Sequence, residues 1–150
     1  MRRGMILFAV LAMLLALAGC GGGDDDSSLS KQEFTNQLKL ACNKGKQERE
    51  TLVTNISRDY YEKHAGRATP EYQEKNLLKL MGVYQGTTEK IADIGLPEGN
   101  EKKVEDFLRA REEAAAKVEA SPLGTRDNLE IILKPAVEKG EALGVGTCDL

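Results

Sequence analysis

The feature that most limits how this chain can fold is a long series of helix caps and helical apolar spacings. No run of alternating β-branched residues, which would indicate a strand, accompanies it. The series starts at Ser30-Lys31-Gln32-Glu33, which has the form of a capping box. From there to Tyr60, apolar residues recur at steps of three or four, so that they share one face of an α-helix. This pattern predicts a helix over residues 31–64 that ends at Gly66.

A second helix start follows within a few residues. Thr69 is a favourable cap, and Pro70 occupies the first helical position, where its missing N–H costs nothing. Gly95 marks the end of this predicted helix. Gly82 and Gly86 lie inside it, four residues apart. They either weaken the helix or allow another helix to approach closely.

Two more amphipathic patterns complete the chain. The third predicted helix begins near Asn100 and stops before Ser121-Pro122, and the fourth runs over about residues 125–143. Pro135 lies within the fourth helix, where we expect a kink or a break. Amphipathic helices joined by short connections predict an all-α fold, a four-helix up-down-up-down bundle.

The first residues of the chain have a different character. Arg2 and Arg3 precede a nearly continuous apolar run over residues 5–18, which is too short for the roughly 20 residues that span a bilayer. A signal peptide explains this run better than a membrane anchor. The run ends in Leu17-Ala18-Gly19-Cys20, which resembles the lipobox of bacterial lipoproteins. An ordinary secretory signal with an incidental cysteine is the alternative interpretation.

The lipobox resemblance implies a domain organisation and a location. Residues 1–19 would be a lipoprotein signal peptide, and Cys20 would become the first mature residue with a diacylglyceryl group on its sulfur. The glycines, aspartates and serines that follow offer little to bury, so we expect a flexible acidic tether over residues 20–29. Residues 30–150 would form the helical bundle domain, held by lipid on the extracytoplasmic face of the bacterial cell membrane.

With Cys20 acylated, Cys42 and Cys148 are the remaining cysteines in a protein exported to an oxidising compartment. We therefore expect a disulfide between them. Two unpaired buried thiols are the alternative. Helix lengths agree with the disulfide, because a fourth helix running antiparallel to the first brings Cys148 level with Cys42.

A broader resemblance rests on three features together: the cysteine in the first predicted helix, the ending Ala142-Leu143-Gly144-Val145-Gly146-Thr147-Cys148, and the lipobox with its tether. The chain resembles a type of small actinobacterial lipoprotein. This resemblance implies the topology and the location, and it transfers no active site.

No catalytic motif stands out. His64 is the single histidine, and its place in the last turn of a helix is typical of a capping or surface residue. No metal site and no cofactor are predicted, because His64 has no partners at ligand spacing and no phosphate-binding loop occurs. The net charge of −3, made more negative by loss of Arg2 and Arg3, disfavours nucleic-acid binding. We predict that the protein is not an enzyme.

Four tyrosines, Tyr60, Tyr61, Tyr72 and Tyr84, are expected near the turn between the first two helices. Packing in the core with their hydroxyls near solvent is the favoured interpretation, and an apolar ligand cleft lined by these tyrosines is the alternative. The preferred function is that of a lipid-anchored adaptor that binds an envelope protein. The alternative is a lipid-anchored carrier or sensor that binds an apolar small molecule between helices.

Overall fold

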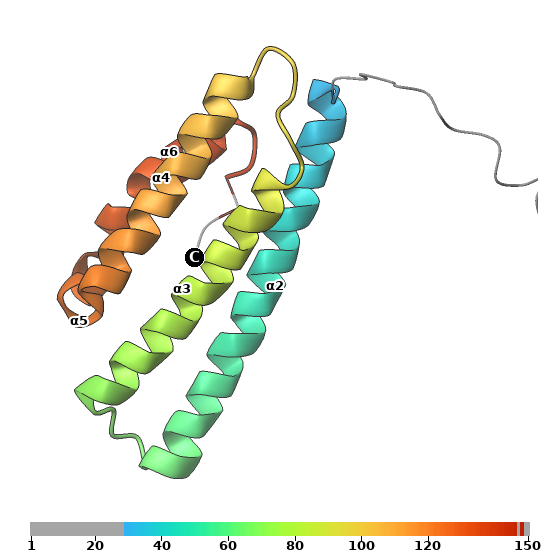
Figure 1. Cartoon of the computed structure of the whole chain (residues 1–150). Helices are drawn as coiled ribbons and strands as arrows, with labels where there is room; N and C mark the ends of the chain where they lie inside the picture. The colour runs from blue at the N-terminus through green and yellow to red at the C-terminus, as the bar shows by residue number, and fades with distance from the viewer. Residues whose placement is uncertain (1–28, 147, 149–150) are drawn as a thin grey trace, which may run out of the picture.

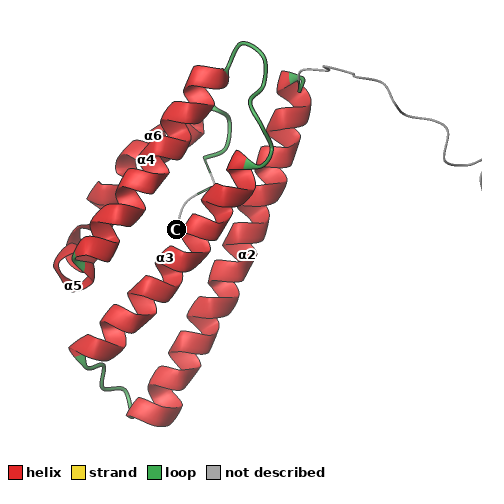
Figure 2. Ribbon diagram, viewed as in Figure 1, coloured by secondary structure: helices red, strands yellow, loops and turns green. Residues whose placement is uncertain are grey.

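The computed structural model describes residues 29–146 and Cys148, and this part of the chain contains helices and turns but no strand (Figures 1 and 2). The predicted all-α fold class is therefore confirmed. The predicted signal peptide, the predicted lipid-bearing Cys20 and almost all of the predicted tether lie outside the described residues.

Helix α2, Lys31–His64, has the predicted bounds. Its capping box is formed: the Ser30 hydroxyl accepts a bond from the Glu33 backbone N–H, and the Glu33 carboxylate accepts one from the Ser30 N–H, both at 3.2 Å. At the other end the chain leaves the helix through Ala65, with φ 47°, and Gly66, with φ 75°. Local signals at both ends thus explain why α2 begins and ends where it does.

Helices α3, Pro70–Ala92, and α4, Glu101–Ala120, also agree with the predicted starts. The Thr69 hydroxyl accepts a bond from the Tyr72 backbone N–H at 3.2 Å, so it caps α3 as expected. The space beside Gly82 and Gly86 is open, so these glycines do not receive another helix.

The close approach occurs at Gly45 of α2 instead. A methyl group added there would overlap the side chain of Thr87 on α3, at both its γ and its β atoms. The absence of a side chain at Gly45 therefore lets these two helices come together at this point.

The fourth predicted helix is corrected at its start. Residues 122–128 form the short helix α5, Pro122–Thr125, and the 3₁₀ turn η1, Arg126–Asn128, before α6 runs over Leu129–Ala142. Pro122 starts a helical turn of its own, and this turn ends before α6 begins. Helix α6 continues through Pro135 without a break. The carbonyl deprived of its usual partner belongs to Ile131, whose residue is 70% exposed, so water can serve it.

Two apolar clusters form the core. The first joins the beginning of α2 to α3, α4 and the C-terminal tail: Phe34, Leu38, Cys42, Ile91, Val104, Phe107, Val145 and Cys148. The second lies between α3, α4 and α6: Leu77, Met81, Tyr84, Ala114, Ala115, Val118 and Leu133.

The second half of α2 belongs to neither cluster. The extensive helix contacts pair α2 with α3, α3 with α4, and α4 with α6 (Figure 1). Leu52, Ile56 and Tyr60 continue the apolar stripe of α2, yet they are only half-buried. The second half of α2 thus packs on α3 and extends beyond the two core clusters.

The predicted disulfide is present between Cys42 and Cys148, whose Cα atoms are 4.7 Å apart. It fastens the C-terminal tail to the first half of α2. The backbone carbonyl of Cys148 also accepts a bond from Arg111 Nη1 on α4, at 2.6 Å. Tail, α2 and α4 are therefore joined at one place.

Candidate functional site

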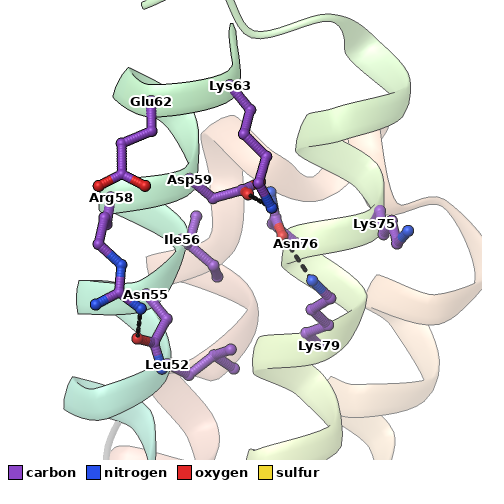
Figure 3. Close-up of a pocket in the computed structure, with 10 residues that line it drawn as sticks. All are labelled: Leu52, Asn55, Ile56, Arg58, Asp59, Glu62, Lys63, Lys75, Asn76 and Lys79. Carbon is purple, nitrogen blue, oxygen red and sulfur yellow. Dashed lines mark hydrogen bonds and ion pairs between the residues drawn. The ribbon is translucent and has the colours of Figure 1, made fainter.

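A polar cleft of about 500 Å³ lies between α2 and α3, in the hairpin that these two helices form (Figure 3). We call it the α2–α3 cleft. Its walls come from the second half of α2 and from the first half of α3: Leu52, Asn55, Ile56, Arg58, Asp59, Glu62, Lys63, Lys75, Asn76 and Lys79. Neither α4 nor α6 makes an extensive contact with α2, so the second half of α2 leaves this space open beside α3.

Cations outnumber carboxylates around the cleft. Arg58, Lys63, Lys75 and Lys79 line it, against Asp59 and Glu62. A cleft lined mainly by one sign of charge raises the local concentration of ligands of the opposite sign. The lining therefore favours an anionic group.

Asp59 lies inside this positive surrounding. One of its oxygens is 2.6 Å from Lys63 Nζ, and the other is 3.8 Å from His64 Nε2. The hydrogen bond from Lys63, with further contributions from Lys63, His64 and Lys79, lowers the pKa of the Asp59 carboxyl below its ordinary value. The same bond raises the pKa of Lys63.

Asn76 is the least exposed polar side chain of the cleft, with 7% of its surface exposed. Its Oδ1 accepts a hydrogen bond from Lys79 Nζ at 3.3 Å, while its Nδ2 has no partner among the described residues. A buried amide without a partner costs about 1–3 kcal/mol, so this group stands out as a place where something else can bind.

Asn76 also borders a smaller cavity of about 260 Å³. This cavity shares Asp59, Lys75 and Lys79 with the α2–α3 cleft and adds His64 and Tyr72 from the end of the hairpin. The side chain of Asn76 therefore borders both the α2–α3 cleft and this cavity.

Three of the four predicted cleft tyrosines do lie together. Tyr60 packs against Tyr61, with ring centroids 5.1 Å apart, and against Tyr72, at 6.2 Å. The Tyr60 hydroxyl donates to the carbonyl of Gly66, and the Tyr72 hydroxyl donates to that of Ile56 at 2.9 Å. These contacts fasten the turn between α2 and α3, so the tyrosines support the end of the hairpin, and Tyr72 borders the smaller cavity there.

Tyr84 does not belong with the other three. It is 4% exposed and lies in the second core cluster, with the Arg111 guanidinium 3.8 Å from its ring centroid. Its position on α3 is three to four turns from Tyr72, which separates them by about 18 Å along the helix. The four tyrosines therefore do not line one cleft, which corrects the cleft interpretation, and the position of Tyr84 agrees with core packing.

Arg111 is a buried charged residue in the core that was not predicted from the sequence. It is 2% exposed, and its donors reach the Thr88 hydroxyl at 2.8 Å, the Tyr84 carbonyl at 3.1 Å and the Cys148 carbonyl. It connects α3, α4 and the tail, and it serves the architecture. Asn76 was missed as well, although both residues fall on the apolar stripes of their helices.

No group of three or more metal-binding side chains occurs within residues 29–146 and Cys148. His64 stacks near Tyr72, with ring centroids 4.4 Å apart, and faces Asp59. Among the described helices, none has both the length and the apolar character that a membrane crossing requires.

Comparisons with protein-family models, with curated proteins and with solved structures found no match to this chain. The geometry of the α2–α3 cleft is therefore the observation from which a function must be argued.

Proposed function

We propose that this chain is a lipid-anchored binding module on the extracytoplasmic face of the bacterial membrane. Cys20 would carry the diacylglyceryl group, as in the small actinobacterial lipoproteins that the sequence resembles. An envelope protein would be its partner, and the α2–α3 cleft would be the surface it presents.

The placement of the cleft along α2 supports this proposal. The described chain begins at Leu29, beside the start of α2, and Ile56 in the cleft is about 38 Å further along the helix. An anchor attached before Leu29 would hold one end of α2 at the membrane. The cleft would then be carried at the far end, where a partner can reach it.

The lining of the cleft distinguishes between the two functions expected from the sequence. An apolar ligand is bound by an apolar, largely enclosed pocket. Charged side chains of α2 and α3 surround the α2–α3 cleft instead. A polar group of a partner protein fits this lining better than an apolar small molecule, so the adaptor function is preferred.

The state of Asp59 supports a binding role for the cleft. Asp59, a carboxylate that lines the cleft, is paired with Lys63. This pairing keeps Asp59 ionised and makes it a poor proton acceptor.

For the fold, we also infer the up-down-up-down order of the helices, which is supported by the short connections at residues 65–69 and 93–100.

Cell fractionation tests the anchor. Cys20→Ala should remove the protein from the membrane fraction or leave it unprocessed, whereas Ser28→Ala, a control in the same segment, should leave it membrane-bound at its mature size. A Cys20→Ala protein that stays in the membrane at its mature size would contradict the anchor.

Native mass spectrometry of the protein extracted from its own membranes tests the partner. A co-purifying polypeptide that is lost from variants of the cleft supports the adaptor function. A bound apolar molecule of a few hundred daltons would favour the carrier instead.

A further inference from the structure

The α2–α3 cleft already holds one carboxylate, that of Asp59. Lys63 donates to it at 2.6 Å, and His64 lies 3.8 Å from its second oxygen. The hydrogen bond from Lys63 is the main cause that lowers the pKa of this carboxyl, and the charges of Lys63, His64 and Lys79 add to it, so the surroundings of Asp59 stabilise a carboxylate group. Asp59 therefore shows which chemistry the cleft accepts.

Donors remain in the cleft after Asp59 has been served. Asn76 is only 7% exposed, and its Nδ2 has no hydrogen-bond partner among the described residues. Lys79 Nζ holds the Oδ1 of the same amide, which leaves Nδ2 as the edge that is free to donate. Lys75 also borders the cleft, and no bond or ion pair joins it to another described residue.

The lysine side chains beside these donors lie at the surface of the molecule. Lys79 is exposed, and the side chain of Lys63 is 72% exposed. Long lysine side chains change rotamer readily at a surface. Lys63 and Lys79 can therefore move aside for a ligand without any movement of α2 or α3.

From this geometry we propose that the α2–α3 cleft binds a second carboxylate, with Asn76 Nδ2, Lys75 Nζ and Lys79 Nζ as its donors. The inference deepens the proposed function by naming what the cleft recognises. The carboxylate belongs either to an acidic side chain of the partner protein or to a free small dicarboxylate, and the same donors serve both.

Nuclear magnetic resonance of the ¹⁵N-labelled full chain in a maltoside detergent tests this proposal. The side-chain amide signals of Asn76 are followed during titration with succinate and, separately, with a glutamate-rich peptide. The expected result is a saturating shift of the Asn76 signals with at least one of the two ligands. Saturation with succinate indicates a free dicarboxylate, and saturation with the peptide alone indicates an acidic segment of a protein.

Three variants locate the site. Lys75→Gln combined with Lys79→Gln should weaken binding about tenfold or more, because two charge-assisted hydrogen bonds are lost. The matched control, Lys102→Gln combined with Lys103→Gln on α4, removes the same charge from an exposed surface elsewhere and should change the affinity less than about twofold.

Asn76→Asp provides a variant that folds while losing the site. Its new carboxylate faces Lys79 and replaces the unpartnered N–H, so thermal stability should be kept or raised, while binding of either ligand is abolished. Unshifted Asn76 signals, equal weakening in the α4 control, retained binding in Asn76→Asp, or stronger binding of inorganic phosphate than of succinate would each overturn the proposal.

This test is independent of the anchor and of the partner. If Cys20→Ala is released from membranes and a partner co-purifies while the titrations fail, the carboxylate inference alone is lost. If the titrations succeed with a chain that is not lipid-anchored, the proposed function fails and the carboxylate site stands.

Discussion

Arg111 shows how a charged side chain can be part of a core. Its guanidinium stacks on the Tyr84 ring and donates to two backbone carbonyls and one hydroxyl, so its donors face oxygen atoms that are fixed by helices and by the tail. Arginine suits this place because its planar fork supplies several donors in fixed directions.

Replacement of Arg111 should be costly. Arg111→Ala removes the donor of the Cys148 carbonyl and opens a cavity, so we expect a loss of about 2–4 kcal/mol in the free energy of unfolding, measured by urea denaturation. Arg111→Lys should restore only part of it, because one ammonium group cannot reach all three oxygens. The control Arg109→Ala removes an exposed arginine paired with Asp106 and should cost less than about 1 kcal/mol. Equal losses at 109 and 111 would contradict a structural role for the buried guanidinium.

Asp59 gives the molecule a pH-dependent contribution to stability. Its pKa is lower in the folded chain than the ordinary value of about 3.9, because Lys63 bonds to the ionised form. A carboxyl with a depressed folded pKa stabilises the fold above its unfolded pKa, and it loses this contribution as the pH falls through the folded pKa.

Thermal unfolding of Asp59→Asn and of the natural chain should therefore differ at pH 7 and converge below about pH 3. Asp93→Asn, at the exposed end of α3, serves as a control for the loss of one charge. A difference between Asp59→Asn and the natural chain that stays constant down to pH 2 would argue against the ion pair with Lys63.

At the scale of elements, α2 and α3 carry glycines in two different surroundings. Gly45 faces Thr87 at a distance that leaves no room for a methyl group, whereas Gly82 faces open space. Gly45→Ala should cost about 1–3 kcal/mol through overpacking. Gly82→Ala should stabilise the protein by about 0.5–1 kcal/mol, since alanine restricts the unfolded chain and its methyl group would point into open space. Chemical denaturation of both variants checks this, and a stabilised Gly45→Ala would show that the helices separate easily.

The helices could be predicted from the sequence because their signals are local. The capping box at Ser30 and the threonine-proline start at Thr69 each determine a helix start within four residues of chain. The start of α6 was missed because Pro122 begins a separate turn whose extent depends on packing against α3 and α4. Local signals do not report such contacts.

The candidate site was harder to predict than the helices. Asn76 and Arg111 lie on the apolar stripes of α3 and α4, at steps of three or four from buried neighbours, and their spacing alone indicated burial. Asparagine and arginine are usually found at the surface, so neither residue was expected among the buried positions. That Tyr84 lies far from the other tyrosines follows from helix length, whereas the uncovered stretch of α2 depends on how far α4 and α6 extend.

For the whole molecule, the disulfide between Cys42 and Cys148 is the long-range constraint. It spans a sequence separation of 106 residues, and closing such a loop stabilises a fold by about 4–5 kcal/mol in the chain-entropy model. Cys42→Ser combined with Cys148→Ser should lower the free energy of unfolding by about that amount in urea denaturation. Cys20→Ser, by contrast, should leave it within about 0.5 kcal/mol. A loss below about 1 kcal/mol in the double variant would mean that the tail is held by Arg111 and Val145 without the bridge.

The second half of α2, which extends beyond the two core clusters, implies an uneven resistance to local opening. Amides in the second half of α2 are backed by one neighbouring helix, so their hydrogens should exchange with solvent sooner than those around Cys42 and Phe107. A partner seated in the cleft would brace both helices at once. Its arrival should therefore be visible as slowed deuterium uptake over residues 52–63 and 72–79, which gives a way to recognise the partner before its structure is known.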